Sequence, residues 1–157
     1  MEITWVNVAD TAVKIGLGAL ISAISGYVIL KVNLSHEKQK EKQNYYYKQQ
    51  EEKKIKYVEF LSQSQNLVQS YLNTKCTADT DQYKDYLRIF NEVQIISNDE
   101  IRLAAHGLLS AVCQFVVIRK NDQEIDLMKK MRHAIDEKTG FFQKMAQLEV
   151  TKPYEKT

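Results

Sequence analysis

The chain has 157 residues, 27% of them charged, and a formal net charge of +2 at pH 7. This length suffices for one domain with a modest core, and the near-zero net charge argues against a polycation that binds nucleic acid through its overall charge. A single proline and five glycines, among abundant Lys, Glu, Gln, Leu and Ala, favour long helices over sheets. We therefore predict an all-α fold.

An apolar stretch over residues 12–30 dominates the N-terminal part of the chain. Apart from Lys14, it is apolar on every side of a helical wheel. A helix of this length covers roughly 28 Å, which is close to the thickness of a bilayer's hydrocarbon core. We predict a transmembrane helix over residues 12–31, preceded by an extracytoplasmic tail over residues 1–11. Trp5 in this tail is the candidate interface anchor, because an indole suits the headgroup region.

Two alternatives to a membrane span are a signal peptide and a buried helix of a soluble protein. Residues 23–25, Ala-Ile-Ser, loosely fit a small-x-small cleavage pattern, but the tail before the stretch is acidic and the apolar run continues to Leu30. A buried helix would normally keep one polar face, and this stretch has none of any width. Both observations favour the span.

The lysines that flank the stretch predict its orientation. Lys14 is the only basic residue on the N-terminal side, whereas four follow closely on the C-terminal side: Lys31, Lys38, Lys40 and Lys42. The positive-inside rule then predicts a single-pass protein of the cell membrane with its N-terminus outside and its C-terminal domain in the cytoplasm. Two cysteines without a CxxC or metal-ligand spacing, Cys76 and Cys113, agree with a reducing compartment, although one disulfide remains an alternative.

Small residues recur every four positions within the stretch, at Gly18, Ser22 and Gly26. This spacing makes one face on which a second helix can pack closely, and it predicts a homodimer through the membrane. The alternative is that small residues are simply common in membrane spans.

Residues 35–54 are polar on all sides apart from the tyrosines at 45–47, and the segment over residues 32–54 contains no helix breaker. We predict a helical stalk that continues the span, either as a solvated spacer or as part of a loose coiled coil. The four lysines named above are candidate contacts for anionic lipid headgroups, although Glu37 and Glu41 dilute their charge. The rings of residues 45–47, Tyr-Tyr-Tyr, point in different directions on a helix and can pair across a dimer or lean on the distal domain.

From residue 55 onwards the pattern is amphipathic, and it predicts a cytoplasmic antiparallel bundle of about four helices over residues 55–150. Residues 151–157 are predicted to be a frayed tail. The first two helices carry apolar stripes, separated by a loop over residues 73–80: Tyr57, Leu61, Ser64, Val68, Tyr71 and Leu72, then Tyr83, Tyr86, Leu87, Phe90, Val93 and Ile96.

A capping box, in which Ser97 is answered by Glu100, predicts the start of the most apolar of these helices, which we place at the centre of the bundle. Residues 121–124 offer a second helix cap. Residues 138–140, Lys-Thr-Gly, predict a helix stop with Gly140 in the left-handed conformation, followed by one last short helix.

No pattern in the chain points to catalysis. No nucleophile elbow, phosphate-binding glycine loop or HExxH spacing occurs, and the histidines, His36, His106 and His133, stand apart. Clustered carboxylates at predicted helix starts are explained by the helix dipole, and Cys113 lies in an apolar run that raises a thiol pKa. We therefore predict a protein that is not an enzyme and that has no cofactor and no metal.

Four segments together resemble parts of small, largely uncharacterised bacterial proteins with one span, a Lys/Glu/Gln-rich stem and a helical domain. They are residues 38–56, 57–61 (Tyr-Val-Glu-Phe-Leu), 97–101 (Ser-Asn-Asp-Glu-Ile) and 127–132 (Leu-Met-Lys-Lys-Met-Arg). The layout is also similar to that of prophage superinfection-exclusion and bacteriocin-immunity proteins. This resemblance implies a membrane-anchored protein whose cytoplasmic domain acts in phage exclusion, defence or immunity.

Our leading hypothesis is a non-enzymatic interaction protein that is embedded in membrane lipid and binds an unknown protein partner through its helical bundle. The alternative is a membrane-tethered binder of anionic lipid or nucleic acid that acts through the basic stalk, of which nucleic acid is the less favoured ligand. An enzyme of a kind that carries no recognised motif is the third hypothesis.

Overall fold

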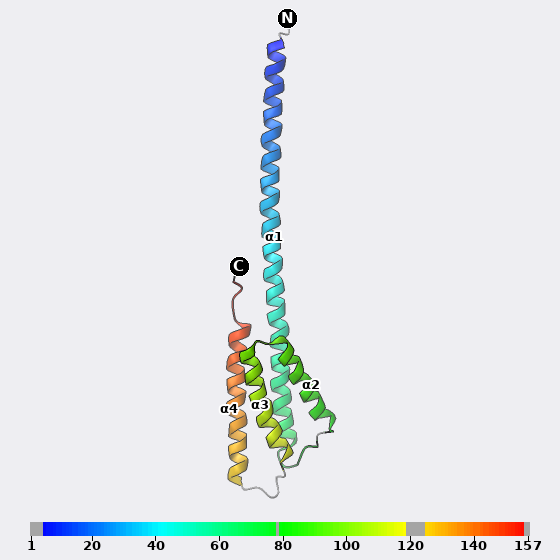
Figure 1. The fold of residues 1–157 in the computed structure, drawn as a ribbon, viewed down its shortest axis with the longest axis vertical. Coiled ribbons are helices and arrows are strands. Elements are labelled where there is room, and N and C mark those ends of the chain that lie inside the picture. The colour runs from blue at the N-terminus through cyan, green and yellow to red at the C-terminus, as the bar shows by residue number, and fades with distance from the viewer. Residues whose placement is uncertain (1–4, 78, 119–124, 156–157) are drawn as a thin grey trace. The chain divides into compact units, whose positions relative to one another are not determined.

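The computed structural model describes residues 5–77, 79–118 and 125–155, and these residues form helices, turns and loops without any strand (Figure 1). The helices are α1 (Trp5–Ser70), α2 (Asp81–Ile96), α3 (Asp99–Val117) and α4 (Ile125–Val150). The prediction of an all-α fold is therefore confirmed. The chain divides into two compact units, unit 1 over Met1–Tyr45 and unit 2 over Tyr46–Thr157.

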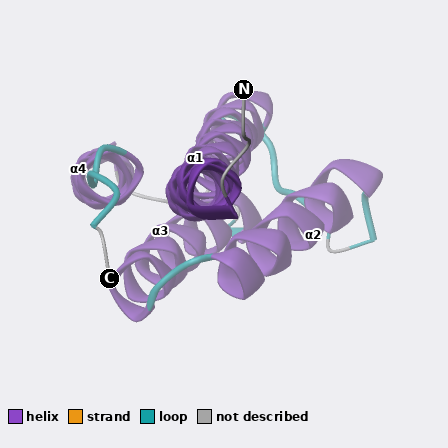
Figure 2. Cartoon of the chain, turned by 90° about the horizontal axis from the view of Figure 1, so that it is seen from above, coloured by secondary structure: helices purple, strands orange, loops and turns teal. Residues whose placement is uncertain are grey.

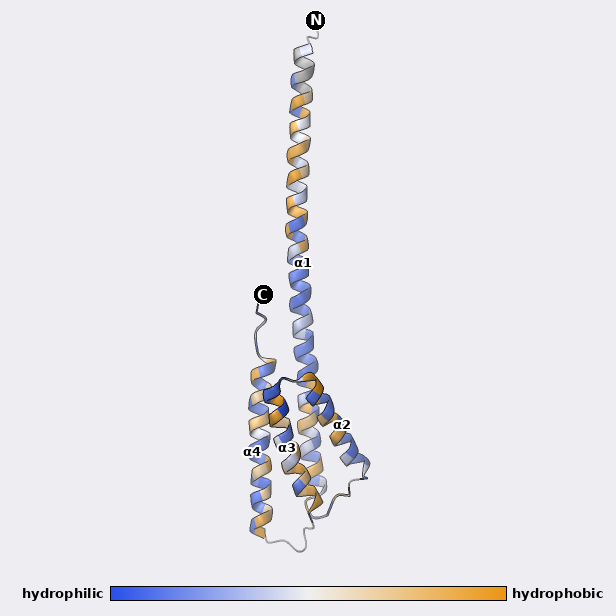
Figure 3. Ribbon diagram, in the orientation of Figure 1, coloured by the Kyte–Doolittle hydropathy of each residue, from blue (hydrophilic) through white to orange (hydrophobic). Residues whose placement is uncertain are grey.

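Unit 1 contains the N-terminal part of α1, which is mainly orange, and thus apolar, in its central turns (Figure 3). Every side chain from Ala12 to Lys38 is exposed, including the large apolar ones of the predicted span. This stretch is long and apolar enough to cross a membrane. In water such a helix would expose apolar surface all round, which is unfavourable.

Unit 2 contains the C-terminal part of α1 together with α2, α3 and α4 around one hydrophobic core. Helix α3 lies between α2 and α4 (Figure 2) and contributes more buried side chains than the other helices of this unit. It also passes a length and hydropathy test for a span. Its buried face accounts for that apolar composition, as the sequence predicted for a central helix: Ile101, Ala104, Ala105, Leu108, Val112, Phe115 and Val116.

The core-facing side of α1 follows a helical spacing of three and four residues, with Tyr57, Phe60, Ser64 and Leu67 buried. The predicted stripe was correct for Tyr57 and Ser64. Its other members only pack against the edge of the core: Leu61, Val68, Tyr71 and Leu72. Because the buried face is rotated by a fraction of a turn from the predicted one, two fully buried residues were missed.

Aromatic side chains from three helices meet at the centre of the core. The ring of Phe60 is stacked on that of Tyr86, with 5.4 Å between centroids, and meets Phe142 edge-on at 5.3 Å. The Ser64 hydroxyl lies 3.1 Å from the Tyr86 hydroxyl and 2.8 Å from the Phe60 carbonyl oxygen. The buried polar atoms at this point are thus satisfied, as a dry core requires.

The predicted helix stop at residues 138–140 is wrong, because α4 runs without interruption from Ile125 to Val150. No glycine in the described residues has a positive φ, so Gly140 is helical and not a left-handed cap. Ile135, Phe142 and Ala146 share one face of α4 and are all buried. Burial of this face outweighs the cost of about 1 kcal/mol for a glycine inside a helix.

The predicted capping box at Ser97 is also wrong. Asn98 is the N-cap of α3, and its side-chain oxygen accepts a hydrogen bond of 2.9 Å from the Ile101 backbone N–H. Ser97 ends α2 instead, and its hydroxyl contacts Tyr57. Thr80 is the N-cap of α2 but makes no capping hydrogen bond with its side chain. The cap predicted at residues 121–124 lies outside the described residues.

Candidate functional site

Gly18, Ser22 and Gly26 lie one helical turn apart on the same face of α1 in unit 1. A Cβ atom added at either glycine would meet nothing within 4 Å. The Ser22 hydroxyl donates a hydrogen bond of 2.9 Å to the Gly18 carbonyl oxygen. Ser22 is the only one of these three residues with a polar side chain, and this bond gives its hydroxyl a partner within the same helix. A polar group in an apolar environment needs such a partner.

The other residues singled out for membrane contact are also in unit 1 and exposed. Trp5 is 88% exposed. The four lysines after the stretch are exposed as well: Lys31, Lys38, Lys40 and Lys42. Lys14 forms an ion pair of 2.6 Å with Asp10, one turn earlier.

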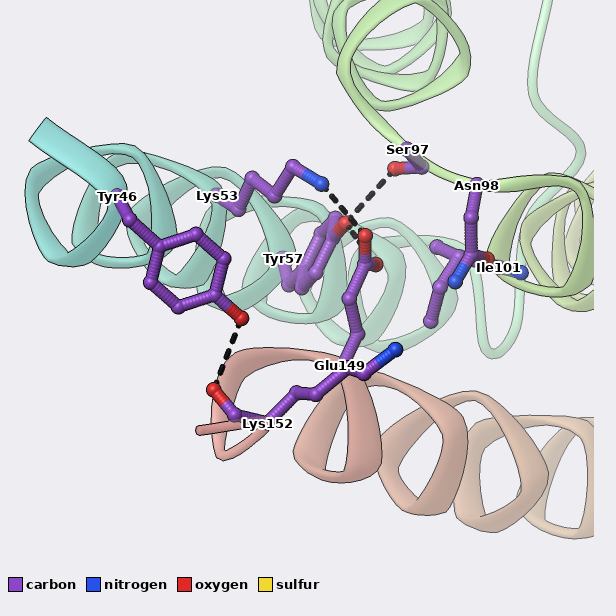
Figure 4. A network of polar contacts seen from close by, with 8 residues as sticks. All are labelled: Tyr46, Lys53, Tyr57, Ser97, Asn98, Ile101, Glu149 and Lys152. Atoms are coloured by element: carbon purple, nitrogen blue, oxygen red, sulfur yellow. Dashed lines mark hydrogen bonds and ion pairs between the residues drawn. The ribbon is translucent and has the colours of Figure 1, made fainter. Parts of the chain in front are cut away.

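Unit 2 contains a polar cluster that sequence reasoning did not find (Figure 4). The Glu149 carboxylate accepts hydrogen bonds from Lys53 Nζ at 2.5 Å and from the Tyr57 hydroxyl at 2.6 Å. The Tyr57 hydroxyl in turn lies 2.9 Å from the Ser97 hydroxyl. We call these four residues the Glu149 cluster. It joins α1, the turn between α2 and α3, and the last turn of α4.

The Glu149 cluster is shielded from solvent, since the side chain of Glu149 is only 9% exposed and that of Lys53 24%. Burial raises the pKa of the Tyr57 hydroxyl, and its hydrogen bond to Glu149 raises this pKa further. Tyr57 therefore stays protonated at physiological pH and acts as a hydrogen-bond donor. This arrangement suits a positioning role, because a neutral phenol is neither a base nor a nucleophile.

Tyr46, the first residue of unit 2, extends the contact between α1 and the C-terminal segment (Figure 4). Its hydroxyl donates a hydrogen bond of 2.9 Å to the Lys152 carbonyl oxygen, and its ring lies 5.6 Å from that of Tyr154. Of the two roles expected for residues 45–47, Tyr46 thus shows the contact with the distal domain. Part of the predicted frayed tail, residues 152–154, makes these contacts.

A groove of about 480 Å³ runs beside the Glu149 cluster, between α1 and the C-terminal end of α2. Its apolar side chains are Ile55 and Ile96, and its polar rim carries both signs of charge: Gln49, Glu52, Lys53 and Lys56. The neighbouring Ile95 is 83% exposed. An apolar floor with a mixed charged rim resembles a surface that binds a helix, not a polar small molecule.

Lys56 on the rim of this groove is held by two carboxylates, Glu92 at 2.7 Å and Glu59 at 3.1 Å. The hydrogen bond to Glu92, followed by that to Glu59, raises the pKa of Lys56, and the same lysine lowers the pKa of Glu92. These side chains are half-buried, with 31–36% of each exposed, so solvent still screens part of their attraction. The rim charges therefore contribute more to specificity than to stability.

The two cysteines are free thiols. Cys76 is buried, and its backbone N–H donates to the Val116 carbonyl oxygen at 2.7 Å. Burial raises the pKa of the Cys113 thiol, to which the Tyr83 hydroxyl donates at 3.4 Å. Among the described residues, no three His, Cys, Asp or Glu side chains group as metal ligands would.

Comparison with known protein families found no match, and neither the curated proteins nor the solved structures gave one. The resemblance of residues 38–56, 57–61, 97–101 and 127–132 to bacterial single-span proteins therefore stays a prediction.

Proposed function

We propose that this protein is a non-enzymatic, single-span membrane protein that presents unit 2 to a protein partner at the cytoplasmic face of the cell membrane. One observation carries the proposal: the apolar side chains of residues 12–34 are all exposed, whereas unit 2 buries its own apolar residues in a separate core. A bilayer is the environment in which such an apolar helix is stable. The apolar residues of unit 2 are already covered by its own core.

The proposed orientation, with the N-terminus outside, is supported by the number of exposed lysines near each end of the apolar stretch: Lys14 alone at its N-terminal end, and Lys31, Lys38, Lys40 and Lys42 after it. Protease added to intact cells would then remove at most a few N-terminal residues, and the same protease would digest unit 2 after permeabilisation. A tag after Thr157 gives the readout. Digestion of unit 2 in intact cells, or recovery of the whole chain in the soluble fraction, would refute the proposal.

The groove beside the Glu149 cluster is the proposed partner site. Its apolar floor and its rim of both charges fit an amphipathic helix whose apolar face is flanked by acidic and basic side chains. Phage exclusion, defence or immunity is the form of function that the layout of the chain suggests.

A photo-crosslinking side chain at Ile55 or Ile96, both of which line the groove, tests the partner site when it is installed in the full chain in its native membrane. Leu148 is a matched control, since it is an exposed apolar residue outside the groove. We expect one partner to be crosslinked from both groove positions and to disappear when Lys53 and Lys56 become Glu. Equal crosslinking from Leu148, or none from the groove, would contradict this site.

Self-association through the membrane is a second proposed interaction, supported by the unobstructed face of Gly18 and Gly26. A membrane reporter of dimerisation should lose signal when either glycine becomes Ile. Gly16→Ile is the matched control, because this glycine also has nothing within 4 Å but lies on another face of α1. A signal that all three variants leave unchanged would exclude this interface.

The alternative function, binding of anionic lipid or nucleic acid by the stalk, is supported by the exposure of Lys31, Lys38, Lys40 and Lys42. Conversion of these four lysines to Gln should then abolish binding to vesicles that contain phosphatidylserine, and added salt should weaken binding steeply. Partner crosslinking that survives this conversion would favour the protein-interaction function instead.

A further inference from the structure

The contacts between α1 and the C-terminal segment are concentrated at one end of unit 2. Tyr46, Lys53 and Tyr57 of α1 contact residues 149–154, and Tyr46 is the residue at which unit 2 begins. The boundary between the two units thus coincides with the first contact that the C-terminal segment makes on α1.

None of residues 46–54 of α1 belongs to the hydrophobic core of unit 2. The first core residue of α1 is Tyr57, and residues 48–54 carry only polar side chains. A helix without an apolar face gains little from packing, so its order within a domain depends on the specific contacts that hold it. Here these contacts come from Glu149, the Lys152 carbonyl group and the Tyr154 ring.

The contacts form two layers that differ in burial. The inner layer is the Glu149 cluster, which is shielded from water. The outer layer is the contact of Tyr46 with Lys152 and Tyr154, and none of residues 151–155 is buried. Release of the outer layer exposes little apolar surface, so it costs far less free energy than unfolding of the core.

We propose that residues 149–155 are a reversible clasp on α1, whose closed state adds residues 46–54 to unit 2 and whose open state releases them. The clasp is a two-state element within unit 2, at the end where this unit begins. It also controls one wall of the groove, because Lys53 both lines the groove and binds Glu149. The proposal does not depend on any partner.

Hydrogen exchange of the full chain in detergent, resolved by mass spectrometry, tests the clasp. In Glu149→Gln we expect the backbone amides of residues 46–54 to exchange about tenfold faster or more, since a charged hydrogen-bond partner is lost. The amides of residues 60–67, next to the core, should exchange as in the unchanged protein. Lys54→Gln is the matched control, because Lys54 pairs only with Glu51 of the same helix in the contacts described.

Tyr154→Ala opens only the outer layer and leaves every buried side chain in place. We expect faster exchange confined to the first turn of unit 2, around residues 46–50. The exchanged pair Lys53→Glu with Glu149→Lys should restore protection relative to either single variant. The clasp is refuted if residues 46–54 exchange at an unchanged rate in Glu149→Gln and Tyr154→Ala, or if residues 60–67 accelerate equally.

Discussion

At the scale of single residues, Glu149 shows how one carboxylate holds three parts of unit 2 together. Its oxygens accept from an ammonium group and a phenol, and that phenol also contacts the turn between α2 and α3. Charge-assisted hydrogen bonds in a shielded site are stronger than their exposed counterparts. The side chains at this site therefore act as a unit, not as separate surface pairs.

Tyr57→Phe should lower the free energy of unfolding of unit 2 by about 1–3 kcal/mol, because Glu149 and Ser97 both lose a buried hydrogen-bond partner. Phenylalanine keeps the ring contact with Phe142, which lies 5.8 Å away. Thermal or denaturant unfolding of the full chain measures the effect. Tyr47→Phe is the control, since Tyr47 is exposed and outside the cluster, and an equal loss in both variants would contradict the role of the buried hydroxyl.

Alkaline pH should destabilise unit 2 through its tyrosines. The hydrogen bond to Cys113, together with burial, raises the pKa of Tyr83 to about 12 from an ordinary value near 10. Because the folded state binds this proton more tightly, the stabilisation is complete below pH 10 and is lost as the pH rises through 12. Tyr83→Phe should flatten the fall in unfolding free energy between these values, and an unchanged slope would contradict the assignment.

At the scale of elements, α4 shows why the boundaries of a helix are harder to predict than its existence. The α4 segment was expected as two helices, yet its buried face continues through Gly140. A local signal for a helix stop was overruled by packing, because a continuous apolar face gains more from the core than one glycine costs.

Gly140→Ala should raise the unfolding free energy by about 0.5–1 kcal/mol. The glycine is helical, and an added Cβ atom meets nothing within 4 Å. A left-handed Gly140, as a helix stop would require, predicts the opposite sign, because alanine is strained in that conformation. The shift in melting temperature of the full chain decides between the two.

At the scale of the whole molecule, the two units differ in how much of their apolar surface they expose. Unit 1 exposes apolar side chains all round its helix, whereas unit 2 buries an aromatic core drawn from all four helices. One continuous helix, α1, contributes residues to both units. Its N-terminal part matches a bilayer and its C-terminal part a protein core, and this change of pattern along a single element is visible in Figure 3.

A fragment of residues 46–157 should fold by itself, because every core residue of unit 2 lies within it. We expect a helical circular dichroism spectrum and one cooperative thermal transition in detergent-free buffer. Fragment 58–157 is the informative comparison, since it lacks Tyr57 and Lys53 and should melt at a lower temperature. A fragment 46–157 without a cooperative transition would show that unit 2 depends on unit 1.

The sequence by itself determined that the chain is helical, that residues 12–30 are apolar all round, and that an apolar helix begins near residues 97–101, although its N-cap is Asn98 and not the predicted Ser97. Each of these features depends on local composition or on a helical period, and both can be recognised from residues close together in the sequence. Only the tertiary structure decided which side of α1 is buried, that α4 is continuous, and that Lys53, Tyr57 and Ser97 meet Glu149. These features join residues about 40 to 100 positions apart, and no local pattern encodes which partners the folded core brings together.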